Sequence, residues 1–301
     1  MQRLLASGIE LAYDIFGDEA NEAIVLISGL GTQRIRWADP FCLTLATRGY
    51  QVIRFDNRDA GGSTHFHEHA APDFNTLAAT LMAGRRPPVP YTLYDMAHDV
   101  VGLLDALSIQ RAHMVGRSMG GMIAQVLASE HADRVASLTS IMSGTGNPSL
   151  PGAAPDVMAM MMSPAPDPRL DEAAYVAHKV AFARRIAGSA FPFDESHHRE
   201  LVKEELRRAY DPASTGRQIA AIAVAGDRRA QLATIKAPSL IVHGLDDPLV
   251  HPACGEDTAS SIQGAEWMPI AGMGHDIPAP LYDRLASAIE RNAWRGIKDA
   301  R

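Results

Sequence analysis

Short runs of apolar residues alternate along this chain with longer stretches in which apolar residues recur every three or four positions. The short runs are typical of buried strands, and the longer spacing is typical of amphipathic helices. The alternation predicts an α/β fold, with a mostly parallel sheet covered by helices on both faces. Strands are predicted at 11–16, 24–28, 52–55, 113–116, 135–142, 239–244 and 266–270, and helices at 38–48, 94–107, 119–130 and 277–294.

Two stretches interrupt this alternation. After the Gly- and Pro-rich segment GTGNPSLPGAAPD, which is typical of a linker, the chain shows helical patterns without strands. A block of helices between two strands predicts a lid, or cap, formed by residues 144–230, on a core domain formed by residues 1–143 and 231–301. The other stretch, 59–93, contains four prolines and is longer than most loops, so we expect it to be functional or partly mobile.

The composition limits the classes of protein to which this chain can belong. The 301 residues are 47 % hydrophobic and 21 % charged, which is the balance of a globular protein with a sizeable core. The net charge is −7 without a dense basic run, which argues against nucleic acid as a partner. No window approaches ~20 uninterrupted apolar residues, and the first residues lack a signal-peptide pattern. Two cysteines, Cys42 and Cys254, are expected to be reduced thiols. We therefore expect a soluble cytoplasmic protein with no membrane partner, and the sequence does not indicate its oligomeric state.

The strongest local motif is Gly116-Arg117-Ser118-Met119-Gly120, which follows a predicted strand and opens a predicted helix. In this context a G-x-S-x-G motif indicates a nucleophilic serine on a sharp turn. Glycines on both sides let the strand and the helix approach each other, and the helix N-terminus favours negative charge near the hydroxyl. The alternative is a serine that only caps a helix.

A nucleophilic serine needs a base and an orienting acid, and in this context they follow it in the order acid, then histidine. The last two predicted strands run into Asp246-Asp247 and into a Gly-rich loop with His275. Both loops leave the carboxyl ends of strands, where open α/β sheets gather their sites. We therefore predict a triad of Ser118, Asp247 and His275, with Asp246 as the fallback acid. Asp276 is predicted to charge the first turn of the last helix.

Acyl transfer develops negative charge on the carbonyl oxygen, and backbone N–H groups commonly stabilise it. One donor is predicted to be Met119, which follows the nucleophile, and the other Leu30, in the loop SGLG after the second predicted strand. The predicted reaction is a two-step hydrolysis of a small-molecule ester. His275 takes the Ser118 proton, and Asp247 fixes the tautomer of the imidazole.

With these residues in place, the chain resembles the α/β-hydrolase superfamily over nearly its whole length, and it is similar to the aclacinomycin methylesterase-like hydrolases. The resemblance implies a mostly parallel eight-stranded sheet, a helical lid after the sixth strand and no cofactor. Arg117 departs from the family pattern, in which a neutral residue often precedes the serine. A structural ion pair is favoured for Arg117 over a role in attracting anionic substrates. The motifs that carry the resemblance are ISGLG at 27–31, DNRDAGGS at 56–63, GRSMGG at 116–121, HGLDDPLV at 243–250 and GMGH at 272–275.

The run Val-Met-Ala-Met-Met-Met at 157–162 bears on the substrate. Methionine side chains are flexible and line surfaces that accept varied apolar shapes. Either Met158, Met161 and Met162 line the site, which predicts small to medium hydrophobic esters, or they only fill the gap between lid and core. The competing activities on the same triad are perhydrolysis of the haloperoxidase-like kind and lactone hydrolysis. In another class, the competing function is a slow-turnover ligand-binding receptor on the same fold.

Histidines outside the predicted triad offer two further patterns. His65, His67 and His69 alternate in a way that suits metal ligands on a strand edge, but triad hydrolysis needs no metal, and no metal site is predicted. His197 and His198 lie in a charged helical stretch and are predicted to be solvated.

Overall fold

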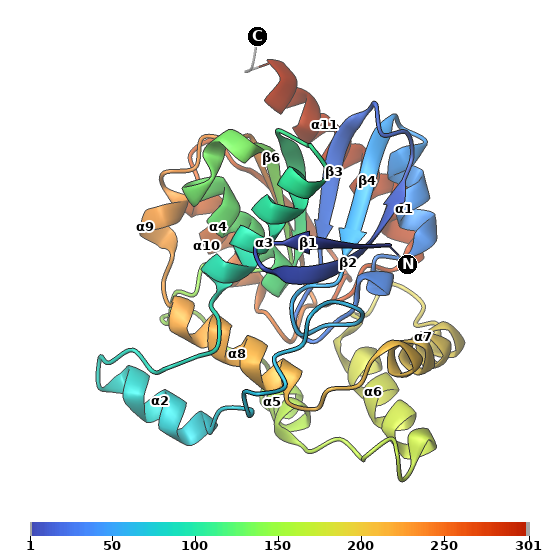
Figure 1. The fold of residues 1–301 in the computed structure, drawn as a ribbon, viewed down its shortest axis with the longest axis vertical. Coiled ribbons are helices and arrows are strands. Elements are labelled where there is room, and N and C mark those ends of the chain that lie inside the picture. Colours follow the sequence, from blue (N-terminus) through green and yellow to red (C-terminus); the bar gives the residue numbers. More distant parts are fainter. Residues whose placement is uncertain (1, 299–301) are drawn as a thin grey trace.

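A computed structural model describes residues 2–298 of the chain (Figure 1). Eight strands form one sheet in the order β1-β2-β4-β3-β5-β6-β7-β8. From β4 to β8 all neighbouring strands pair in parallel, and β2 pairs with β1 and β4 in antiparallel fashion. The prediction of an α/β fold with a mostly parallel eight-stranded sheet is therefore confirmed.

The strands are β1 (Gln2–Ala6), β2 (Ile9–Phe16), β3 (Glu22–Ile27), β4 (Tyr50–Phe55), β5 (Ala112–Arg117), β6 (Val135–Ile141), β7 (Ser239–Gly244) and β8 (Glu266–Ile270). The α-helices are α1 (Asp39–Ala46), α2 (Phe74–Met82), α3 (Leu93–Ala106), α4 (Met119–Glu130), α5 (Pro155–Met162), α6 (Glu172–Ile186), α7 (Glu195–Arg208), α8 (Ser214–Ala225), α9 (Arg229–Leu232), α10 (Pro252–Ser261) and α11 (Tyr282–Lys298). Short 3₁₀ turns lie at Arg34–Arg36, Ala132–Arg134 and Ala279–Leu281.

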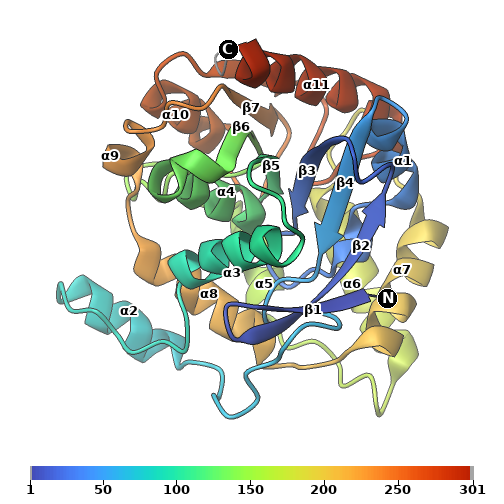
Figure 2. The ribbon, with the colours of Figure 1, turned by 45° about the horizontal axis from the view of Figure 1, so that its top comes forward.

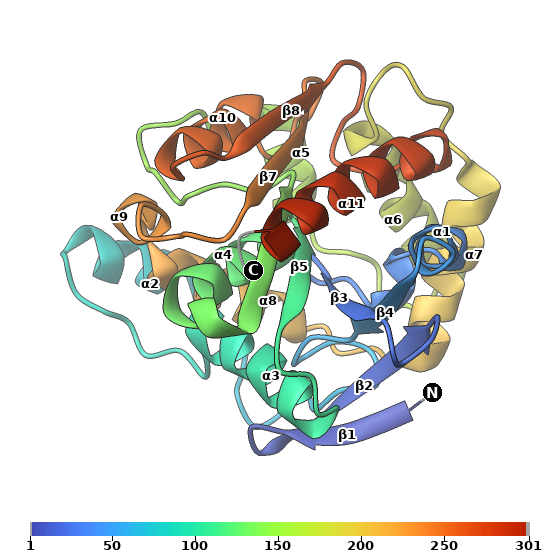
Figure 3. The same ribbon diagram turned by 90° about the horizontal axis from the view of Figure 1, so that it is seen from above.

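Helices cover both faces of the sheet. Seen from above, α3, α4, α9 and α10 lie on one side, and α1 and α11 lie on the other (Figure 3). Alternate residues of a strand point to opposite faces, and β3 shows the result: Val25 and Ile27 belong to one buried cluster, whereas Ile24 and Leu26 belong to the other. Because both faces are buried, the strand is a continuous apolar run.

The elements that the pattern did not predict include β1, α2 and α10. Helix α2 lies inside the stretch expected to be irregular, and the side chain of Asp73 caps its first turn. The last helix begins at Tyr282 rather than at residue 277, because prolines at 278 and 280 accompany a 3₁₀ turn before it. Asp276 therefore lies outside this helix, and the prediction that it charges the first helical turn is wrong.

Between β6 and β7 the chain forms the helices α5 to α9, which we call the helical insertion. In Figures 1 and 2, α5 to α8 lie together beyond the carboxyl ends of the parallel strands. Helix α9 packs instead against α4 and α10. The boundaries 144–230 for a separate lid stay a prediction.

Arg228 joins the two ends of the helical insertion. Its side chain is 1 % exposed, and its guanidinium donates to the carbonyl oxygen of Gly144 at 2.6 Å and to Gln125 Oε1 at 3.2 Å. Its backbone amide donates to Thr145 O at 2.8 Å. Burial lowers the pKa of Arg228 to about 10. The hydrogen bonds thus hold the start of the insertion against its end.

Helix α7 is joined to the core by ion pairs. Glu205 accepts two hydrogen bonds from Arg36, at 2.7 and 2.8 Å, and Arg208 donates to the buried Asp56 at 2.9 Å. Nearer the start of α7, His198 Nε2 lies 3.6 Å from Asp276 Oδ2, and the His198 side chain is only 12 % exposed. The prediction that His198 is solvated is therefore wrong, whereas His197 is exposed.

Within residues 2–298, both cysteines are free thiols, in agreement with the expectation from their number. None of the helices in this part of the chain is both long and apolar enough to cross a membrane.

Replacing Arg228 with alanine should lower the free energy of unfolding by about 2–4 kcal/mol, because buried carbonyl groups lose their donor. The matched control is Arg229→Ala, since Arg229 is exposed and pairs only with its near neighbour Asp227. The control should change stability by less than about 1 kcal/mol. Urea denaturation followed by circular dichroism measures both variants, and equal effects would contradict the role given to Arg228.

Asp276 gives a prediction about pH. Burial works to raise its pKa, but the hydrogen bond from His198 and the charges of Arg117 and His198 lower the pKa to about 2. A carboxylate with a lowered pKa stabilises the fold above its ordinary pKa, and this contribution is lost as the pH falls through the lowered value. The unfolding free energies of the parent and Asp276→Asn should therefore differ by about 1–2 kcal/mol at pH 5. The difference should shrink toward pH 2 in denaturation curves, and a constant difference would disprove this.

Candidate active site

Ser118 lies at the sharp turn between β5 and α4. Its backbone has φ 55° and ψ −124°, a conformation that is strained for any residue with a side chain. A Cβ atom on Gly116 would lie 2.1 Å from Gly120 O, and one on Gly120 would lie 2.1 Å from Ile27 O. Only glycines at these two positions allow α4 to begin so close to β5 and β3. The predicted strand–turn–helix arrangement is therefore present.

Ser118, His275 and Asp247 lie in one hydrogen-bonded row, although 157 residues separate the first two. Ser118 Oγ lies 3.0 Å from His275 Nε2, and His275 Nδ1 lies 2.7 Å from Asp247 Oδ2. An ionised carboxylate only accepts, so Nδ1 carries the proton and donates to Asp247. Nε2 is then free to accept the Ser118 hydroxyl proton. His275 is 6 % and Asp247 4 % exposed, which strengthens both hydrogen bonds.

The surroundings of Asp247 keep it ionised. Its Oδ1 atom accepts from the amides of Leu249 and Val250, each at 2.9 Å, and His243 Nε2 lies 3.4 Å from its Oδ2. Burial works to raise the pKa of Asp247, but its interaction with His275 and these hydrogen bonds lower it well below the ordinary range. Asp246 instead accepts a hydrogen bond from Ser189. Between the two aspartates, it is Asp247 that contacts His275.

The loop that carries His275 is held by the helical insertion. The His275 amide donates to Ile186 O at 2.6 Å, and the Gly274 amide donates to Ala187 O at 3.1 Å. The amides of Ser189 and Ala190 donate in the other direction, to Gly272 O, at 3.0 and 3.1 Å. Residues 186–190, which we call the 186–190 segment, thus pair with residues 272–275. Backbone hydrogen bonds therefore position the imidazole, and no local sequence motif marks the residues that form them.

The loop between β3 and α1 carries Leu30 and passes close to Ser118. A Cβ atom on the neighbouring Gly29 would lie 3.2 Å from Ser118 Cβ, so this loop touches the serine. Within residues 2–298, the hydrogen bonds leave the N–H groups of Leu30 and Met119 without an acceptor. Their role as donors to a bound oxygen atom stays a prediction.

The loop at 28–31, which carries the predicted donor Leu30 and which we call the oxyanion loop, has support from two sides. Gln218 of α8 accepts from the Gly31 amide at 2.8 Å and donates to Arg58 O at 3.0 Å. From the core, Asn57 donates to Ser28 O at 3.0 Å. The helical insertion therefore contacts both the loop of His275 and the loop of Leu30.

Neither of the predicted roles of Arg117 agrees with its position. Among the described residues no carboxylate forms an ion pair with it, so the expected ion pair is wrong. Its guanidinium lies over the Trp37 ring, 5.9 Å from the centroid, and donates to Arg36 O at 3.3 Å. Burial lowers the pKa of Arg117, whereas the charge of Asp276 opposes this. The side chain is 8 % exposed, which does not suit a role at an open entrance.

Helix α5 carries the candidate methionines. The Ala154 amide at its start donates to Pro248 O at 2.8 Å, so α5 begins beside the loop of Asp247. Met158 and Met162 are 44 % and 62 % exposed, and Met161 is partly buried. Their exposure argues against a role only as filling between lid and core. Whether they line the substrate stays a prediction.

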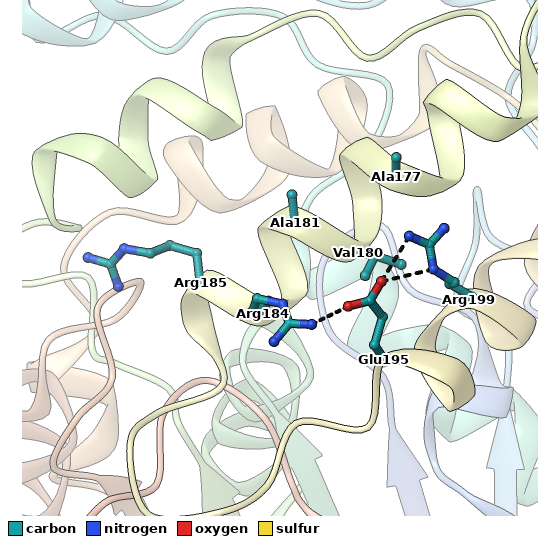
Figure 4. Close-up of a pocket in the computed structure, with 7 residues that line it drawn as sticks. All are labelled: Ala177, Val180, Ala181, Arg184, Arg185, Glu195 and Arg199. Carbon is teal, nitrogen blue, oxygen red and sulfur yellow. Dashed lines mark hydrogen bonds and ion pairs between the residues drawn. The ribbon is translucent and has the colours of Figure 1, made fainter.

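A cavity of about 500 Å³ lies between α6 and α7, on the helical insertion. Figure 4 shows that Arg184 and Arg199 converge on Glu195 there, so much of the charge is paired within the cavity. The predicted triad is not among its lining residues, which are Ala177, Val180, Ala181, Arg184, Arg185, Glu195 and Arg199. The cavity therefore gives no information about the substrate of the candidate site.

Sequence reasoning missed several residues that build the site. Gln218 and the 186–190 segment lie far from every motif, so no local signal marks them. Asn57 and His243 lie inside two of the family motifs, DNRDAGGS and HGLDDPLV. Their positions inside these motifs could have identified Asn57 and His243 as site residues. The contacts that they form, however, depend on the fold.

Comparisons with known proteins agree with this geometry. A family model described as the alpha/beta hydrolase fold matches residues 22–278. The chain is 30 % identical to rhodomycin D methylesterase DauP of Streptomyces sp. (strain C5), over 91 % of each chain. It is also 30 % identical to the putative carbamate hydrolase RutD of Variovorax paradoxus (strain S110), over 91 % of this chain and 93 % of that one.

Among solved structures, the chain is similar to an enol-lactonase from Burkholderia xenovorans LB400. The TM-score is 0.72 with 25 % identity, and the alignment covers 97 % of this chain and 99 % of the other. The strand order, the strained serine turn and these likenesses lead to one conclusion. The chain belongs to the α/β-hydrolase family, and it is a hydrolase.

Proposed function

We propose that this protein hydrolyses carboxylic esters by acyl transfer, with Ser118 as nucleophile, His275 as base and Asp247 as orienting acid. The observation that supports this most directly is the row of hydrogen bonds at 3.0 and 2.7 Å that joins the three side chains. A neutral imidazole in the correct tautomer, next to a serine on a strained turn, is the arrangement that makes a hydroxyl nucleophilic.

In the first step, Ser118 Oγ forms a bond to the ester carbonyl carbon while its proton moves to His275 Nε2. The carbonyl oxygen becomes an oxyanion and accepts from the free N–H groups of Leu30 and Met119. The C–O bond to the alcohol then breaks, and the alcohol leaves with the proton from Nε2. Asp247 stays ionised, so that it stabilises the imidazolium that forms in between.

In the second step, a water molecule gives a proton to His275 Nε2 and attacks the acyl-enzyme. The same two amides stabilise the second oxyanion. Collapse of this intermediate breaks the bond to Ser118 Oγ, which takes the proton back and releases the acid. The chain supplies every group that these steps need, and no step uses a cofactor or a metal ion.

We infer the substrate class from the relatives and from α5. The relatives include a methylesterase, a putative carbamate hydrolase and an enol-lactonase, so an ester or a closely related acyl compound is the common chemistry. The exposed Met158 and Met162, on a helix that begins beside the acid loop, favour an apolar partner. We therefore propose small to medium hydrophobic esters, with Met158, Met161 and Met162 among the residues that contact them.

Replacing Ser118 with alanine should lower kcat/KM for a p-nitrophenyl ester at least about 10⁴-fold, because the nucleophile is lost. Asp247→Asn should lower it about 10³–10⁴-fold, because the imidazole loses its correct tautomer. The matched control is Asp246→Asn, which keeps an acceptor for Ser189 and should leave kcat/KM essentially unchanged. A larger loss in Asp246→Asn than in Asp247→Asn would overturn the assignment of the acid.

Turnover distinguishes an esterase from a binding protein on the same fold. In a stopped-flow experiment with excess p-nitrophenyl ester, we expect a burst of p-nitrophenol of one equivalent or less, followed by steady release. The same protein should prefer linear hydrophobic esters to lactones and carbamates in a substrate panel. Peracid formation with added hydrogen peroxide should be slower than ester hydrolysis. Acylation without turnover would instead indicate a receptor.

A further inference from the structure

Three potential metal ligands from distant parts of the chain converge beside the helical insertion. His65 and His67 lie in the loop after β4, and Asp211 precedes α8. The Nδ1 atoms of the two histidines lie 3.4 and 3.3 Å from the same atom, Asp211 Oδ2. His69, the third of the alternating histidines, is not part of this group.

The hydrogen bonds of His65 call for a proton or a metal ion between its Nδ1 atom and the carboxylate of Asp211. His65 Nε2 lies 3.1 Å from the carbonyl oxygen of Gly61. A carbonyl oxygen only accepts, so Nε2 carries a proton. In the neutral ring, Nδ1 then presents a lone pair to Asp211 Oδ2, which also only accepts. Two acceptors that face each other repel, unless a proton or a metal ion lies between them.

The second ring offers a metal ion another ligand. His67 directs its Nδ1 at the same oxygen, and its ring is nearly parallel to that of His65, with 5.2 Å between centroids and 6° between planes. One divalent ion satisfies both lone pairs and the carboxylate together.

The distances suit a tetrahedral ion. Zn²⁺ bonds of about 2.0–2.2 Å to nitrogen and oxygen place neighbouring ligand atoms about 3.3–3.6 Å apart, and the two Nδ1–Oδ2 distances agree with this. Histidine ligands of metals commonly donate their other ring N–H to a backbone carbonyl, which fixes the tautomer. His65 has this bond to Gly61.

The nearby charges leave room for a cation. Arg217 donates to the same Oδ2 atom of Asp211, and its guanidinium also forms hydrogen bonds of 2.7 and 2.8 Å to both oxygens of the buried Asp59. Together these three groups carry one net negative charge. Asp211 Oδ1 accepts from the Ala213 amide at 3.0 Å, so the backbone holds the carboxylate in place.

We propose that His65, His67 and Asp211 bind one Zn²⁺ ion, with water in the fourth position. Two imidazole nitrogens and one carboxylate are a donor set that Zn²⁺ and Co²⁺ accept readily. The ion joins the loop after β4 to the segment that enters α8. Helix α8 in turn holds the oxyanion loop through Gln218. Its role is structural, and the inference does not rest on the proposed esterase function.

Titration of the full-length, chelator-treated protein with Co²⁺ tests the site. We expect one equivalent to bind with the intense visible absorption of a tetrahedral complex, and Zn²⁺ to displace it. His67→Ala should weaken binding about 10–100-fold, because it removes one ligand. The His67 side chain is 71 % exposed, so this variant is expected to fold.

Two matched controls are His69→Ala and His197→Ala, which remove histidines outside the group. Both should bind Co²⁺ like the parent. Zn²⁺ should also raise the thermal midpoint of the parent and of these controls but not that of His67→Ala. The proposal is overturned if the parent takes up no Co²⁺, or if His67→Ala binds it as tightly as the parent.

Discussion

His275 reaches Ser118 from a loop whose backbone is paired with the 186–190 segment of the helical insertion. Four hydrogen bonds between the two segments, from 2.6 to 3.1 Å, fix where the imidazole can lie. A shift of about 1 Å in a catalytic group is enough to weaken catalysis severely. The position of the imidazole therefore depends on the insertion as much as on the sheet. The oxyanion loop shares this dependence, because Gln218 of α8 contacts it directly.

Buried ion pairs hold the helical insertion in place on the core. Asp56 illustrates this: it lies fully buried, accepts from Arg34 of the core at 2.5 Å and from Arg208 of α7 at 2.9 Å. Such pairs contribute little net stability, because removing two charges from water offsets most of their attraction. Breaking one is nevertheless strongly unfavourable, since the remaining charge stays buried. We infer that these ion pairs determine where α7 docks on the core more than they add to the stability of the fold.

Much of the core and of the site was predictable from local pattern. Strands such as β7 and β8 match the predicted ranges because each is a short apolar run between turns. Ser118 and Met119 follow from one motif, and Asp247 and His275 from the ends of these two strands. The family prediction is confirmed by the comparisons.

What could not be predicted depends on contacts between distant segments. Arg117 was expected in an ion pair, but the nearby carboxylates Glu205 and Asp276 interact with Arg36 and His198 instead. The three alternating histidines looked alike in the sequence, and only the approach of Asp211 separates two of them from the third. Edge strand β1 has no continuous apolar run, because one face is exposed. Local pattern carries no information on any of these pairings.

The helical insertion forms hydrogen bonds to both loops of the candidate site. This has a consequence for how related proteins change their substrates during evolution. A cap that merely covered a finished site would be exchangeable between relatives, and each exchange would bring a new specificity. Here the helical insertion supplies part of the scaffold that holds His275 and the oxyanion loop. Substrate range is therefore expected to change by side-chain replacement within the insertion, while its backbone path and its partner residues in the core are inherited together.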